Sequence, residues 1–220
     1  MFSQKQNSWV HTSGSANMLL NPQGSFVVRT CFLGCVWLGI PSASMPAVQP
    51  EVAGDYDRVI LGEQSGYVTG LFSDCTGECK FSCQFFFEGK RRGDRFAIVA
   101  SEPGTNGLIR GEAKLVGKKL WLKLAESPGG CWNVEPEIHK SGTDVLLNSA
   151  APWLQIRLAK NNIAVFDKPG GQTKWHLQLN AAVIVLRHDS TWLYIRLPGG
   201  DTRTGWVKTA DLQPLRKRTK

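Results

Sequence analysis

The chain has 220 residues, of which 42% are apolar and 20% are charged, and its formal net charge is +8. This composition is typical of a globular protein of one or two domains. The positive charge is not arranged as a basic helix or an aromatic–basic RNA-binding pattern, so we expect no nucleic-acid partner.

Residues 1–44 have the layout of a secretory signal peptide. They contain no Asp or Glu, and Arg29 is followed by an apolar run over residues 31–40 and then by small residues. The run is shorter than the roughly 20 residues of a membrane span, so we expect no transmembrane segment after signal removal. Because residues 1–17 are polar, Met18 is an alternative start. We therefore expect a periplasmic or secreted protein. The alternatives to a signal peptide are that the apolar run is a buried strand or an uncleaved membrane anchor.

Four cysteines remain after residue 44: Cys75, Cys79, Cys83 and Cys131. An even number in an exported chain predicts two disulfides, and the spacing lacks the paired C-x-x-C of structural zinc sites. On one strand Cys79 and Cys83 would lie about 13 Å apart, too far to bond. This favours Cys75–Cys79 across a turn and Cys83–Cys131. The pairing of Cys79 with Cys131 and Cys75 with Cys83 stays open.

Residues 54–150 are predicted to form an antiparallel β-domain tied by these disulfides. No stretch has a sustained helical period, and short alternating runs are separated by Gly, Pro, Asn and Asp. In residues 120–124 three leucines alternate with Trp121 and Lys123. Phe81, Phe85 and Phe87 share one strand parity, and this row is expected in the core. The predicted strands are Tyr56–Leu61, Tyr67–Phe72, Cys79–Phe87, Arg95–Ala100, Leu108–Leu115, Leu120–Leu124 and Asp144–Asn148.

A second unit, residues 153–215, precedes a basic tail at 216–220. It contains an Ala-x-Phe-x-x-Pro segment at 164–169, the run TWLYIRL at 191–197 and the run GWVKTADL at 205–212. In this order they resemble the bacterial SH3 (SH3b) family over roughly residues 155–215, although Asn180-Ala181-Ala182 replaces the usual Gly-Asp turn. The resemblance implies a small SH3-like barrel, so the predicted fold is all-β, a disulfide-tied domain followed by that barrel.

Barrels of this kind bind extended peptides in a shallow aromatic groove. The resemblance implies that the ligand is a peptidoglycan peptide or an envelope protein. The ligand-binding candidates are Trp175, Asp189, Tyr194 and Arg203. Trp175 adjoins a polar loop, and Arg203 could bind a carboxylate through two hydrogen bonds. The residues expected to fill the core of this unit are Phe166, Trp192, Ile195, Trp206 and Val207.

A second hypothesis comes from the loop around Cys131, which carries Ser127, Pro128, Gly129, Gly130 and Trp132. A cysteine-tethered Gly/Pro loop ending in Trp132 could enter the cleft of a lytic enzyme at little ordering cost. No H-x-x-x-H or H-x-H motif is present and the cysteines are expected to be oxidised, so we expect no catalytic residue, metal or cofactor. The sequence thus predicts a non-catalytic recognition module in the periplasm or cell envelope. The alternative is a periplasmic inhibitor or immunity protein that blocks a cell-wall-degrading enzyme or toxin.

Overall fold

Two antiparallel β-sheets account for most of the chain that the structure, a computed structural model, describes: residues 52–105 and 107–215. All described residues fall in one compact unit. The all-β prediction is confirmed. The predicted signal peptide, with its alternative start at Met18, and the basic tail at 216–220 lie outside the described residues.

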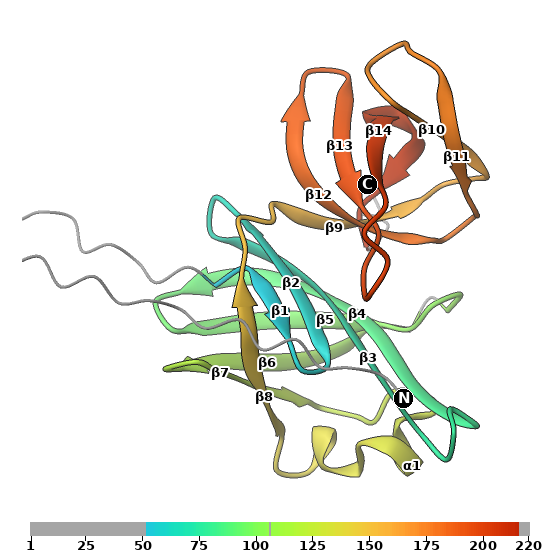
Figure 1. The fold of residues 1–220 in the computed structure, drawn as a ribbon. Helices are drawn as coiled ribbons and strands as arrows, with labels where there is room; N and C mark the ends of the chain where they lie inside the picture. The colour runs from blue at the N-terminus through green and yellow to red at the C-terminus, as the bar shows by residue number, and fades with distance from the viewer. Residues whose placement is uncertain (1–51, 106, 216–220) are drawn as a thin grey trace, which may run out of the picture. The chain divides into compact units, whose positions relative to one another are not determined.

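The first sheet closes into a barrel of eight strands in sequence order, in which β1 pairs with both β2 and β8 (Figure 1). Closure satisfies the hydrogen-bonding groups that an open sheet would expose at its edges. The strands are β1 (Gly54–Tyr56), β2 (Val59–Gln64), β3 (Tyr67–Thr76), β4 (Phe81–Arg92), β5 (Arg95–Ser101), β6 (Ile109–Val116), β7 (Lys119–Leu124) and β8 (Thr143–Ala150). A short helix α1 (Cys131–Val134) and a 3₁₀ turn η1 (Pro136–His139) lie between β7 and β8.

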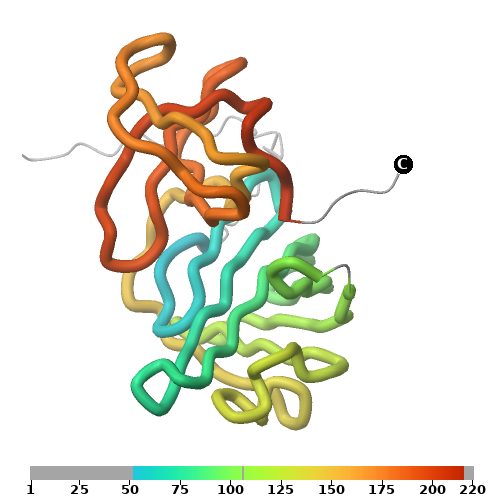
Figure 2. The backbone as a smooth tube through the Cα atoms, turned by 90° about the vertical axis from the view of Figure 1, so that its right-hand side faces the viewer, coloured from blue at the N-terminus to red at the C-terminus, as the bar shows by residue number. Residues whose placement is uncertain are grey.

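The bounds of all seven predicted strands differ from the observed ones, most of them by one to five residues at an end, and two of the differences affect the fold. The predicted strand Tyr56–Leu61 is divided into β1 and β2, and β4 begins at Phe81 instead of Cys79. Glu78 and Cys79 have positive φ angles, 56° and 61°, so they belong to the turn of the β3–β4 hairpin. This turn extends past the neighbouring strands (Figure 2).

The two predicted disulfides, Cys75–Cys79 and Cys83–Cys131, are both confirmed, with Cα atoms 4.8 Å and 4.4 Å apart. They exclude the other pairing. The first closes the turn of the β3–β4 hairpin. The second is fully buried and joins β4 to α1. Disulfides persist in oxidising compartments, and they indicate such a compartment here. No helix within 52–105 and 107–215 is both long and apolar enough to span a bilayer.

Along each barrel strand, side chains that point inward alternate with side chains that point outward, as expected for a β-strand. Leu120, Leu122 and Leu124 are each at most 1% exposed, as the alternation in β7 predicted. Phe85 stacks on the ring of Phe72, with ring centroids 4.8 Å apart. Phe85 and Phe87 are therefore part of the core, as expected, whereas Phe81 lies next to the turn of the β3–β4 hairpin and is 50% exposed, so the prediction is wrong for this residue.

The second sheet has seven strands in the order β11-β10-β14-β13-β12-β9-β15. They are β9 (Gln155–Ala159), β10 (Ile163–Phe166), β11 (Thr173–Leu177), β12 (Ala182–Asp189), β13 (Trp192–Arg196), β14 (Thr204–Lys208) and β15 (Leu212–Gln213), with a 3₁₀ turn η2 (Thr209–Asp211) before β15. Its core consists of small and branched side chains, among them Val165, Val183, Leu193, Ile195 and Val207. Ile195 and Val207 are buried as predicted.

The barrel and the second sheet share a buried apolar cluster that includes Leu71 and Phe86 from the barrel and Ile156 from β9. The backbone N–H of Ile156 donates to Thr69 Oγ1 at 2.7 Å. At Gly62 a Cβ atom would lie 2.8 Å from the backbone of Gln155, so only glycine permits this approach. These contacts join the two sheets through buried groups.

Candidate functional site

One face of the second sheet carries four aromatic residues, Phe166, Trp192, Tyr194 and Trp206, which we call the aromatic face. In β13, Leu193 and Ile195 are buried, whereas Trp192 and Tyr194 alternate with them and are half-buried. The register pairs Tyr194 with Trp206 and Trp206 with Phe166 across the neighbouring strands. The four rings therefore belong to the same face of the sheet.

The prediction that Phe166, Trp192 and Trp206 fill the core is wrong, because all three are only half-buried. The core is already filled by the opposite row of side chains. The sequence does contain a signal for the outward position of this row. Trp192 and Tyr194 share their strand parity with Arg196, and a cation in an alternating row marks the side that faces outward.

Arg187 completes the aromatic face. Its guanidinium carbon lies 4.7 Å from the ring centroid of Tyr194 and 5.5 Å from that of Trp206. The two rings are themselves 5.1 Å apart, and the hydroxyl of Tyr194 donates to Thr204 Oγ1 at 2.9 Å. Such contacts fix the rings and leave an exposed guanidinium beside them. Sequence reasoning missed Arg187.

The two other rings of the aromatic face also touch. Phe166 and Trp192 meet edge to face, with centroids 5.5 Å apart. Asp189 is exposed at the end of β12 and pairs with Trp192 in the register. The candidates Asp189 and Tyr194 therefore share this face.

The candidates Trp175 and Arg203 form a separate contact. Trp175 pairs with the buried Val165 and packs against the core of the second sheet, so it does not share the aromatic face. The guanidinium carbon of Arg203 lies 4.9 Å from the Trp175 ring centroid. Asp201 holds that guanidinium through contacts of 2.7 to 3.1 Å, and the hydrogen bonds from Arg203 lower the pKa of Asp201. Arg203 is therefore already paired with a carboxylate.

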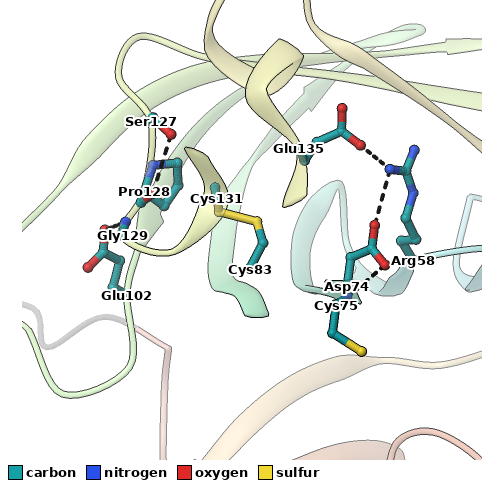
Figure 3. Close-up of a disulfide and its surroundings, with 10 residues drawn as sticks. All are labelled: Arg58, Asp74, Cys75, Cys83, Glu102, Ser127, Pro128, Gly129, Cys131 and Glu135. Carbon is teal, nitrogen blue, oxygen red and sulfur yellow. Dashed lines mark hydrogen bonds and ion pairs between the residues drawn. A yellow bond between two sulfur atoms is a disulfide. The ribbon is translucent and has the colours of Figure 1, made fainter. Parts of the chain in front are cut away.

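In the barrel, the predicted loop around Cys131 ends at Gly130, because helix α1 begins at Cys131 and carries Trp132. The loop before α1 is held at several points (Figure 3). The Cys83–Cys131 disulfide fixes its end to β4, and the backbone N–H of Gly129 donates to the carboxylate of Glu102. Within the loop, the hydroxyl of Ser127 donates to the carbonyl of Pro128 at 3.3 Å.

Trp132 itself is 66% exposed and its ring lies 5.5 Å from that of His139. Gly130 has φ = +77°, and a Cβ atom there would lie 2.2 Å from the carbonyl oxygen of Ser82. The single turn of α1 thus presents an exposed indole directly after a constrained loop.

Arg58 anchors the segment that follows this loop. Its guanidinium contacts the carboxylates of Glu135 and Asp74 (Figure 3). It also donates to Thr143 Oγ1 at 3.0 Å. Glu135 is 9% exposed, so the guanidinium supplies the charge that its buried carboxylate needs. Within 52–105 and 107–215 no group of three or more His, Cys, Asp and Glu side chains could hold a metal ion. Comparisons of the chain with protein-family models, with curated proteins and with solved structures found no match.

Proposed function

We propose that the protein is a non-catalytic recognition module of the periplasm or cell envelope, and that it binds an extended peptide on the aromatic face of the second sheet. In this proposal the second sheet is an SH3-like module and residues 1–44 are a signal peptide. One observation carries the proposal: Tyr194 and Trp206 are half-buried and in mutual contact, with the exposed guanidinium of Arg187 over both rings.

The chemistry of the aromatic face suits a short acidic peptide. Ordered aromatic rings offer apolar contact area at a low entropic cost, since they are already fixed by their neighbours. The guanidinium of Arg187 can donate two parallel hydrogen bonds to a carboxylate. Peptidoglycan stem peptides are extended and acidic, and they are the ligand class that we propose; a segment of an envelope protein with the same chemistry is the other.

The test is sedimentation of the full chain with purified peptidoglycan sacculi, followed by titration with a soluble stem peptide. We expect Arg187→Gln to weaken peptide binding about tenfold or more, as loss of a charge-assisted hydrogen bond does. Arg203→Gln is the matched control, because it also removes an arginine that lies over a tryptophan. A loss confined to Arg203→Gln would move the site to Trp175, and equal binding by both variants and the native chain would refute the proposal.

The alternative function, inhibition of a lytic enzyme or toxin, has one supporting observation: Trp132 is 66% exposed in the short helix α1, whose first residue is anchored by the Cys83–Cys131 disulfide. A capture experiment from envelope extract separates the two functions. Capture of a single hydrolase, lost in Trp132→Ala and retained in Arg187→Gln, would favour the inhibitor. Binding to sacculi with the reverse pattern would favour the wall-binding module.

A further inference from the structure

The outer surface of strands β4 to β7 carries a row of three cations and one tryptophan. The register pairs Arg92 with Arg95, Arg95 with Lys114, and Lys114 with Trp121. These four residues, the cationic row, lie on four neighbouring strands (Figure 1). At about 4.8 Å between strands, the row is about 14 Å long.

A hollow of about 490 Å³ adjoins the cationic row. All four residues of the row line it, and small side chains such as Ala97 leave the space unfilled. Glu112 also lines the hollow and supplies a carboxylate among the cations. The lining of the hollow therefore combines three cationic donors, one indole and one carboxylate acceptor.

The charges around the hollow are strongly unbalanced. The same outward face carries three further cations, Lys90, Arg110 and Lys123, according to strand parity and register. Within the described part of the chain, no ion pair includes any of these six cations. The exposed or half-buried carboxylates near them are those of Glu112, Asp94 and Asp144, and Asp144, which lies opposite Trp121, is paired with Lys119 at 3.7 Å. The six cations outnumber these carboxylates, so the face has an excess of positive charge that attracts polyanions.

Trp121 is oriented by the backbone beneath it. A Cβ atom at Gly142, where φ is +83°, would lie 2.5 Å from the indole Nε1. The indole thus packs on the glycine backbone and stays half-buried. An ordered indole beside cations suits a ligand with both an apolar face and negative charges, which is the chemistry of an acidic sugar.

We propose that the cationic row binds an acidic glycan whose sugars carry carboxylates. A sugar ring packs on Trp121, and the carboxylates bind Lys114, Arg95 and Arg92. Two of the three cations are arginines, whose planar guanidinium matches a planar carboxylate. Glu112 accepts hydrogen bonds from sugar hydroxyls, whereas it would repel the phosphates of a nucleic acid. A flat membrane would meet the wall of the barrel but would not enter the hollow.

The test is affinity electrophoresis of the full chain in gels that contain alginate, a glycan of carboxylated sugars, with neutral dextran as the uncharged comparison. We expect alginate and not dextran to retard the chain. The double variant Arg95→Gln/Lys114→Gln should weaken binding at least about tenfold. Its matched control, Lys168→Gln/Lys208→Gln, removes two exposed cations from the second sheet and should bind within about twofold of the native chain.

A second variant separates recognition from simple charge attraction. Trp121→Phe keeps an apolar ring over Gly142 but reduces the stacking area, so we expect weaker alginate binding at unchanged net charge. The proposal is overturned if alginate does not retard the native chain or if the two double variants bind alike. It is also overturned if duplex DNA or vesicles of anionic lipid bind as tightly as alginate and depend on the same residues.

Discussion

The two disulfides should differ in their contribution to stability, because they close loops of very different length. Cys83 and Cys131 are 48 residues apart, and Cys75 and Cys79 are 4 apart. Loop-closure entropy then assigns about 4 kcal/mol to the first and about 2 kcal/mol to the second. With a urea m-value of about 2 kcal/mol/M, loss of each bond lowers the unfolding midpoint by about 2 M and about 1 M.

The assay is urea unfolding of the full chain followed by tryptophan fluorescence. Replacing Cys83 and Cys131 would also leave a cavity, since both side chains are fully buried. The cleaner comparison therefore uses the Cys75→Ala/Cys79→Ala variant with and without dithiothreitol, where reduction breaks only the long-loop bond. If this reduction lowers the midpoint by no more than the double alanine substitution itself, the reasoning from loop length is wrong.

Three further changes test other contacts by urea unfolding. Burial raises the pKa of Tyr56 to about 12. The stability that depends on its neutral phenol is therefore present at neutral pH and lost as pH rises from about 10 through about 12, and Tyr56→Phe should abolish this loss. Thr69→Val leaves the buried N–H of Ile156 without its acceptor, and we expect a cost of about 1–3 kcal/mol. Arg58→Met leaves the buried carboxylate of Glu135 without its main partner, and we expect a cost of about 3 kcal/mol, part of which a second substitution, Glu135→Gln, restores.

The features that the sequence predicted correctly are local, apart from the Cys83–Cys131 bond, which followed by elimination once Cys75 was paired with Cys79. Strand parity placed Leu120 and its two neighbouring leucines inside, and the distance along an extended strand excluded a bond between Cys79 and Cys83. That argument reached the right pairing although Cys79 lies in the turn and not in β4. The closure of β1 against β8 was not predicted, because it joins Gly54 to Ala150 and no local pattern encodes such a distant pairing.

The candidate site was predicted only in part, because both rows of β13 carry apolar residues and only Arg196, at the end of one row, marks the outward side. In β13 one row of alternating side chains begins with Trp192 and the other with Leu193. Hydrophobicity alone favours the larger side chain, that of Trp192, for the core. The structure buries Leu193 and leaves Trp192 half-buried. Arg187 was missed for a related reason: its contacts with Tyr194 and Trp206 require three strands to be aligned.

The two proposed surfaces lie on different sheets, so their effects on wall binding can be separated. If the aromatic face and the cationic row engage one polymer together, each raises the effective concentration of the other. The overall association constant is then proportional to the product of the affinities of the two surfaces, so Arg187→Gln and Arg95→Gln/Lys114→Gln should each weaken sedimentation with sacculi, and their combination should weaken it by about the product of the two losses. If the two surfaces bind separate polymers, their association constants add instead, and either single change should leave most of the sedimentation. A combination that is no weaker than one of the changes alone would contradict two sites and require one composite site.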